Sequence, residues 1–200
     1  MATSHPPSLL NRLSTVVWSV GLLIGIMWCL EATDRLIPAL NLEQYGIYPR
    51  NIQRWYGIFC APFLHGSWRH LLMNTPPFIL FGGLIAFHSL GDLWIVSAIA
   101  ALISGIGVWV IAPAQTITLG ASGVIFGYFG FLLFRGLFER SGVSLFISMI
   151  IAVSYGGLIW QVFPTEPHIS WQAHLFGFIG GVLAASLYSL PGEPQRSELP

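Results

Sequence analysis

The sequence predicts an all-α polytopic membrane protein in which six transmembrane helices form one bundle. Of its 200 residues, 54% are hydrophobic and only 8% are charged, and the mean hydropathy is +0.72. This balance is too apolar for an ordinary soluble domain. The apolar residues also fall into six long runs bounded by charged residues, Pro or Gly. A helix needs about 20 mostly apolar residues to cross the hydrocarbon core, so each run is long enough or nearly so.

Each of these runs is predicted to be a helix. In chain order they cover residues 13–30, 70–90, 93–112, 119–134, 144–163 and 171–190. Residues 1–190 are expected to form a single domain, and residues 191–200 a short, polar, disordered tail.

Three of the runs and the longest connection have individual features. The first run lacks a small-residue cleavage site before Glu31, which favours a retained helix over a removable signal peptide. The second carries Pro76 and Pro77, which are expected to bend it just beyond Asn74. The fourth is the shortest, which leaves room for water above its first turn. Residues 31–69, rich in charged and aromatic side chains, are predicted to form a partly structured interfacial loop.

Composition excludes several classes of partner. The formal net charge is zero, lysine is absent and the arginines are scattered, so neither a nucleic-acid partner nor a polybasic lipid-binding patch is expected. Cys29 and Cys60 have neither metal-site nor disulfide spacing. No His, Cys and carboxylate spacing resembles that of a metalloprotease, and we expect no metal and no cofactor.

Arginine placement bears on the orientation in the membrane. Four arginines fall on each side of the predicted bundle; Arg12, Arg135, Arg140 and Arg196 share the side of the termini. Discounting the long, acid-bearing first loop favours cytoplasmic termini.

Polar side chains inside the predicted spans are the main functional candidates, because burying them in lipid is costly. His70 and Asn74 open the second run, Ser122 lies in the first turn of the fourth, and His174 in the first turn of the sixth. Even-numbered spans run in the same direction, so these side chains are expected at one depth near one membrane face. His88 lies at the other end of the second run and is expected to be an interfacial histidine.

Glycines suggest how two of these spans pack. Small residues four apart occur in both, as Gly123 and Gly127 in the fourth run and as Gly177 and Gly181 in the sixth. Such helices can pack backbone to backbone. The packed seam would then carry the serine against the histidine.

Together, these residues could catalyse acyl transfer. A neutral imidazole within hydrogen-bond reach can activate a serine, and Ser122 with His174 fits a nucleophile and its base. All eight acidic residues lie in loops, tails or span ends, so a dyad is the simpler interpretation. His70, Asn74 and the Ser122 amide could stabilise the oxyanion. A cysteine nucleophile from Cys60 with His65 is a weaker alternative.

Each residue also has a non-catalytic interpretation. A serine in a membrane helix often bonds back to its own backbone, and His174 could be a packed or pore-lining histidine. His70 and Asn74 could form an interhelical polar clamp. Their joint placement at one depth favours the catalytic interpretation.

In three motifs, the sequence resembles the rhomboid family of intramembrane serine proteases. Residues 65–74 resemble the motif of the family's second helix, with its H-x-x-x-N core at His70 and Asn74. Residues 120–123 resemble the G-x-S-G motif around the nucleophile, and residues 170–177 the segment that holds the catalytic histidine. Motif order and helix number agree over residues 13–190.

The resemblance implies a rhomboid-like six-helix bundle in the cell inner membrane, with a water-filled cavity open to the extracytoplasmic side. It implies a Ser122/His174 dyad and oxyanion donors from His70, Asn74 and the Ser122 amide. Substrates would be single-span membrane proteins cut near a helix end, where helix-destabilising residues favour cleavage. Many relatives have a tyrosine that faces the catalytic histidine; Phe126 at this position can stack but has no hydroxyl.

Two other functions remain open. A catalytically inactive protein of the same shape would bind transmembrane clients without cutting them. A small channel or transporter would line a polar path with His70, Asn74 and His174. The latter gives no reason for the glycine-flanked serine.

Overall fold

The computed structural model describes residues 8–164 and 169–187, and this part of the chain is helical. The α-helices are α1 (Leu9–Leu36), α2 (Gly57–Cys60), α3 (Trp68–His88), α4 (Leu90–Ile111), α5 (Ser122–Glu139), α6 (Gly142–Tyr155) and α7 (Trp171–Ser186). Five 3₁₀ segments join them, namely η1 (Pro38–Leu40), η2 (Leu42–Tyr45), η3 (Ile52–Arg54), η4 (Ala61–Phe63) and η5 (Gly156–Val162). The predicted all-α class is confirmed.

Five of the predicted spans correspond to helices that are long and apolar enough to cross a membrane. These are α1, α3, α4, α5 and the continuous α6–η5 segment, Gly142–Val162. The sixth prediction, residues 171–190, coincides with α7, which has 16 residues. Residues 188–190 and the predicted tail at 191–200 lie outside the described residues.

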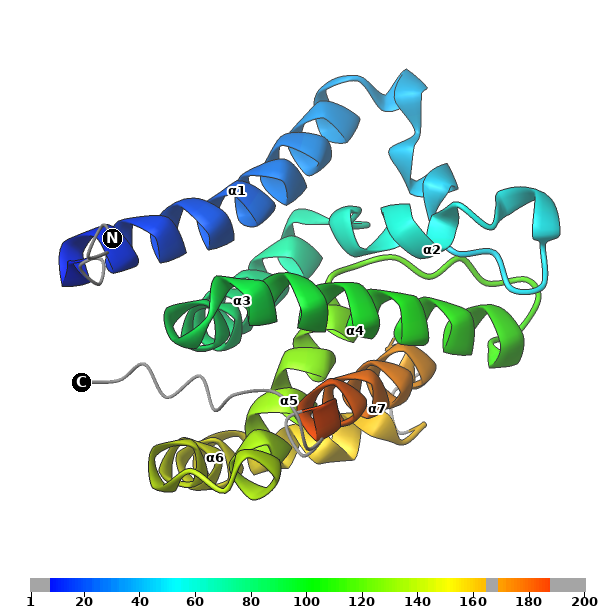
Figure 1. The fold of residues 1–200 in the computed structure, drawn as a ribbon. Coiled ribbons are helices and arrows are strands. Elements are labelled where there is room, and N and C mark those ends of the chain that lie inside the picture. The colour runs from blue at the N-terminus through cyan, green and yellow to red at the C-terminus, as the bar shows by residue number, and fades with distance from the viewer. Residues whose placement is uncertain (1–7, 165–168, 188–200) are drawn as a thin grey trace, which may run out of the picture.

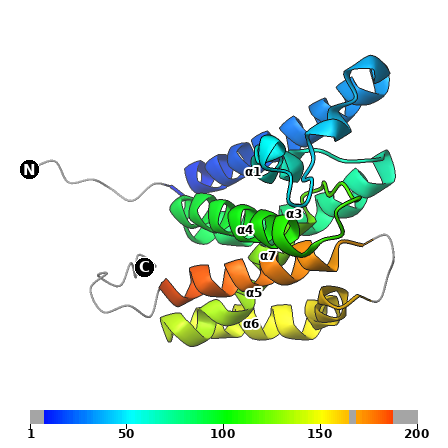
Figure 2. The same ribbon diagram turned by 90° about the vertical axis from the view of Figure 1, so that its right-hand side faces the viewer.

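Helix α5 forms the centre of the bundle. In its most apolar window 67% of residues are buried, against 11% in α1 and 17% in the α6–η5 segment. Figure 1 shows α5 crossing behind α4 and α7, and Figure 2 shows α1 and α6 at opposite edges of the bundle. The aromatic side chains of Tyr128, Phe129 and Phe131 on α5 are fully buried. The residues at the start of α5 are therefore surrounded by other elements, whereas α1 and α6 leave most of their apolar surface for lipid.

Helix α1 is longer than the sequence analysis predicted. It continues to Leu36, so the first loop begins after this residue rather than at Glu31. The charged side chains of its last turns have partners that allow the helix to continue. Arg35 Nε lies 2.8 Å from Glu31 Oε1, and the Asp34 carboxylate accepts the Leu42 N–H at 2.6 Å.

Helix α3 continues through Pro76 and Pro77 without interruption. Each proline lacks the N–H that would reach the carbonyl four residues earlier, on Leu72 and Met73. The side chains of these two residues are exposed, so the altered turn lies on the outer face of the bundle.

The end of α5 also differs from the prediction. Arg135 was expected in the loop after the fourth span, but α5 extends to Glu139 and Arg135 is buried. Its guanidinium makes two bonds to the Glu139 carboxylate, at 2.9 and 3.1 Å. This i,i+4 pairing explains why a charged residue can stay within the helix. Arg135 is therefore part of the helix and not of the loop that follows it.

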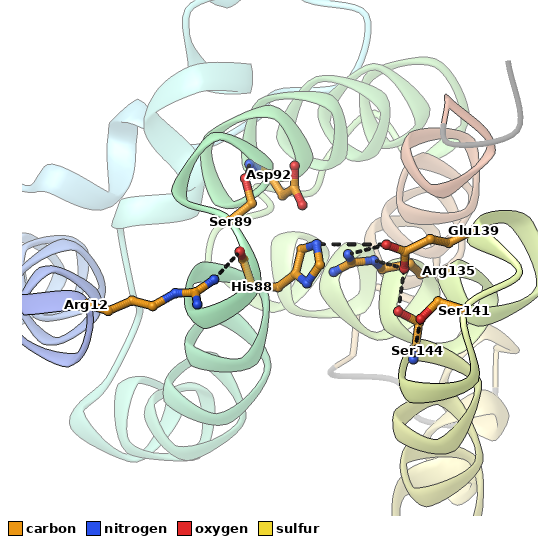
Figure 3. A network of polar contacts seen from close by, with 8 residues as sticks. All are labelled: Arg12, His88, Ser89, Asp92, Arg135, Glu139, Ser141 and Ser144. Atoms are coloured by element: carbon orange, nitrogen blue, oxygen red, sulfur yellow. Dashed lines mark hydrogen bonds and ion pairs between the residues drawn. The ribbon is translucent and has the colours of Figure 1, made fainter. Parts of the chain in front are cut away.

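A polar network joins several helix ends on this side of the bundle (Figure 3). His88 Nε2 lies 3.9 Å from Glu139 Oε1, and the Ser144 hydroxyl donates to the same carboxylate. Arg12 Nη2 donates to the His88 carbonyl at 3.0 Å. The network thus connects α1, α3, α5 and α6 at the end of the bundle opposite to the residues described next.

Candidate active site

The four polar residues singled out in the sequence all lie near helix N-termini. His70 and Asn74 are in the first two turns of α3, Ser122 is the first residue of α5, and His174 is in the first turn of α7. Contacts between α3, α5, α7 and the turn before α5 bring these three helix starts together.

The backbones of α5 and α7 touch at two successive levels. A methyl group added to Gly177 would overlap the Gly123 carbonyl, and one added to Gly181 would overlap the Gly127 carbonyl. Only glycine leaves room for this approach. The seam begins beside the candidate residues, because Ser122 precedes Gly123 and His174 lies one turn before Gly177.

The His174 ring is held from two sides. It stacks on the Phe126 ring with a centroid separation of 4.0 Å and an interplanar angle of 9°. Its Nδ1 lies 3.1 Å from the Gln161 carbonyl oxygen in η5. Since a carbonyl can only accept, this bond requires the ring proton on Nδ1 and leaves Nε2 with a lone pair. The Gln161 carbonyl thus occupies the orienting position that a carboxylate has in a soluble triad.

The Ser122 side chain is half-buried at the start of α5. In the part of the chain that the structure describes, its hydroxyl has no hydrogen-bond partner, neither His174 nor its own helix. Ser122 also borders a small cavity, of about 20 Å³ for a water-sized sphere. Gly120, Ser104 and Ala173 are among the other residues that line it. This volume is enough for about one water molecule.

Possible oxyanion donors surround the turn before Ser122. Gly120 has a φ of +115°, and a Cβ at this position would lie 2.6 Å from His70 Cε1 and 2.8 Å from its Nε2. The His70 ring therefore packs directly on the backbone two residues before the serine. Asn74 Nδ2 donates one hydrogen to the His70 carbonyl at 2.8 Å and has a second one available. The Ser122 N–H belongs to the first turn of α5, where helical amides have no partner within the helix.

His65 contacts both the His70 ring and the backbone of the turn before Ser122. This position was not predicted from the sequence. It is 2% exposed, its Nε2 accepts the Ala121 N–H at 3.4 Å, and its ring meets the His70 ring edge-on at 5.1 Å. From the sequence, His65 had a proposed role only as a partner for Cys60, although it lies within the motif of residues 65–74. The shared motif with His70 was the feature of the sequence that could have indicated a place for His65 in the site.

The environment of His65 predicts a pH-dependent stability. Burial lowers its pKa to about 4, the His70 ring acts in the same direction, and the Phe63 carbonyl opposes them. Because the unfolded chain binds this proton near pH 6.5, stability should fall as the pH drops from about 6.5 to about 4. The difference of about 2.5 pKa units corresponds to about 3 kcal/mol.

Unfolding in detergent across this pH range would test the prediction in the wild type and in His65→Gln, whose amide oxygen can still accept the Ala121 N–H. The wild type should lose more stability than the variant on acidification. Equal losses in both proteins would assign the effect to other groups.

Residues 8–164 and 169–187 contain no group of three His, Cys, Asp or Glu side chains that could hold a metal ion.

Known proteins are similar to the region of this chain that contains the candidate site. The family model of the Rhomboid domain matches residues 53–191, which include all the candidate site residues. The chain belongs to the rhomboid family. An uncharacterized protein of Mycobacterium tuberculosis is 34% identical over 87% of this chain and 75% of its own. The putative rhomboid protease YdcA of Bacillus subtilis is 33% identical over 88% and 89%. Rhomboid-like protein 11 of Arabidopsis thaliana, described as chloroplastic, is 26% identical over 90% and 67%.

Family membership and the apolar helices identify this protein as a multi-pass membrane protein of the rhomboid type. They support an intramembrane protease-like function.

Proposed function

We propose that this protein is an intramembrane serine endopeptidase that uses Ser122 as nucleophile and His174 as general base. The observation that carries the proposal is the fixed orientation of His174. Phe126 and the Gln161 carbonyl hold its ring beside the start of α5, with the Nε2 lone pair free to accept a proton. A half-buried serine whose hydroxyl has no other partner is the matching nucleophile.

In the acylation step, Ser122 Oγ attacks the scissile carbonyl carbon and its proton passes to His174 Nε2. The carbonyl oxygen becomes an oxyanion that accepts hydrogen bonds from the Ser122 N–H, His70 and Asn74. The tetrahedral intermediate then collapses: the C–N bond breaks, and the leaving amine takes the proton from His174. The acyl group remains on Ser122 as an ester.

In the deacylation step, water attacks the ester and passes a proton to His174. The C–O bond to Ser122 breaks, and the serine oxygen recovers that proton. The cavity that Ser122 borders has room for about one water molecule, but its lining residues do not include His174, His70 or Asn74. The reaction needs neither a cofactor nor a metal.

Single-span membrane proteins are the proposed substrates. A peptide bond within a helix is shielded, so a substrate must unwind locally before Ser122 can attack it, and Gly or Pro near the cleavage site should favour this. We place the termini in the cytoplasm and the site near the extracytoplasmic face, as the family resemblance implies.

Cleavage of a transmembrane reporter by the purified, reconstituted protein tests the proposal. We expect two product fragments and, in a parallel reaction, labelling of Ser122 by a fluorophosphonate probe, located by peptide mass spectrometry. Binding of the reporter without cleavage or labelling would favour the client-binding alternative. Ion or solute flux through liposomes without cleavage would favour a channel.

A further inference from the structure

A buried carboxylate on α1 lies close to the candidate site. The Glu31 side chain is only 1% exposed although α1 is the least buried span. One of its oxygens, Oε1, accepts from Arg35 Nε at 2.8 Å. The other, Oε2, is fully buried, and the described part of the chain offers it no hydrogen-bond partner. A buried charge with an unused oxygen is costly, so its retention needs an explanation.

The packing of α1 on α3 places Glu31 beside the start of α3. One turn before Glu31, Trp28 Nε1 donates to the Thr75 hydroxyl at 3.2 Å, and the Trp28 ring lies 5.8 Å from the Trp68 ring. Both contacts are with the first turns of α3, where His70 is located. Glu31 is close enough to interact electrostatically with the His70 ring.

The charges around Glu31 leave a net negative charge. Arg35 is shared between Glu31 and Glu43, with Nη2 lying 3.1 Å from Glu43 Oε1. Glu43 and Arg35 are 40% and 38% exposed, so water screens them, whereas Glu31 is shielded from it. Of these three groups, Glu31 therefore carries the charge that water screens least.

We propose that Glu31 is a positioning residue that acts through His70: its buried charge polarises the His70 ring and strengthens the hydrogen bond that this ring donates to the oxyanion. The inference rests on the proposed function. Glu31 is buried on α1 and has no direct role in substrate contact, whereas the Cε1–Nε2 edge of the His70 ring packs on Gly120, two residues before the serine. A negative charge near a hydrogen-bond donor increases the polarity of its N–H group, and a more polar N–H stabilises a developing oxyanion better.

A structural role for Glu31 in holding Arg35 is the competing explanation, and three variants separate the two. Glu31→Gln removes the charge and keeps the shape. Arg35→Gln breaks the same ion pair but leaves the Glu31 charge less compensated. Glu43→Gln is the matched control, since it removes a carboxylate from the same arginine at an exposed position.

Reporter cleavage should fall about tenfold in kcat for Glu31→Gln with KM unchanged, less than the loss expected for removing an oxyanion donor outright. Arg35→Gln, which leaves the Glu31 charge less compensated, should retain at least the wild-type kcat, and Glu43→Gln should retain the wild-type kcat. In a His70→Ala background, the additional loss from Glu31→Gln should disappear, because its target is gone. A loss in Arg35→Gln equal to that in Glu31→Gln, or a full tenfold effect in the His70→Ala background, would overturn the proposal.

A readout without proteolysis separates this inference from the proposed function. In protein labelled with ¹⁵N-histidine, the His70 ring signals should shift in Glu31→Gln and stay in place in Glu43→Gln. If the wild type cuts no reporter but these signals shift as expected, the protease proposal fails and the Glu31–His70 interaction stands. Unchanged His70 signals in Glu31→Gln overturn the interaction whether or not the protein is active.

Discussion

Replacing Ser122 with Ala is expected to reduce reporter cleavage by at least about 10⁴-fold, and replacing His174 with Ala by a similar factor, because in the proposed mechanism the nucleophile and the base act as one unit. The two substitutions should differ in their effect on stability. The Ser122 hydroxyl is half-buried and has no hydrogen-bond partner among the described residues, so its loss should change stability by less than about 0.5 kcal/mol. Loss of the buried His174 ring removes its stacking on Phe126 and its bond to Gln161, which should cost about 1–3 kcal/mol.

Matched substitutions elsewhere in the bundle provide the controls. Ser154→Ala changes an exposed serine on α6, and His88→Ala changes a histidine at the opposite end of α3. Both should cleave the reporter at close to the wild-type rate, measured by product formation in liposomes at equal protein content. Residual cleavage in Ser122→Ala at the rate of Ser154→Ala would reject Ser122 as the nucleophile.

The sequence predicted those features of the fold and the site that depend directly on the type of residue at a position, such as an apolar side chain or a glycine. Long apolar runs predicted the helices, and the bounds of these runs predicted that His70, Ser122 and His174 would lie near helix N-termini. Glycine spacing predicted close packing of α5 and α7, since the absence of a Cβ can be read directly from the sequence. The positive φ of Gly120 depends on the same property of glycine, but it was not predicted from the sequence.

The remaining features depend on tertiary contacts that leave no such pattern. The Gln161 carbonyl orients His174, yet every residue has a carbonyl, so no residue type marks this role. Glu31 and Arg135 were assigned to loops because they are charged. In the structure each is buried within a helix beside a partner four residues away. An i,i+4 partner makes a charge tolerable inside an apolar helix, but only packing decides whether it is then buried.

The glycine seam predicts the largest effect on stability. In Gly181→Ala, the added methyl group would overlap the Gly127 carbonyl, and in Gly177→Ala it would overlap the Gly123 carbonyl. Backbone atoms within a helix cannot rotate away as a flexible side chain could, so α5 and α7 must move apart. Overpacking of this kind should cost about 2–4 kcal/mol, measured as the free energy of unfolding in detergent micelles.

Gly83→Ala is the matched control for this prediction. Gly83 also lies within a membrane-spanning helix, α3, but an added Cβ there would meet nothing within 4 Å. Because alanine is the better helix former by about 1 kcal/mol, this substitution should be neutral or stabilising. Gly177→Ala should also lower activity in the protein that remains folded, since separating α5 from α7 moves Ser122 away from His174. If Gly177→Ala and Gly181→Ala unfold like Gly83→Ala, the close backbone approach of α5 and α7 would not exist in the membrane protein.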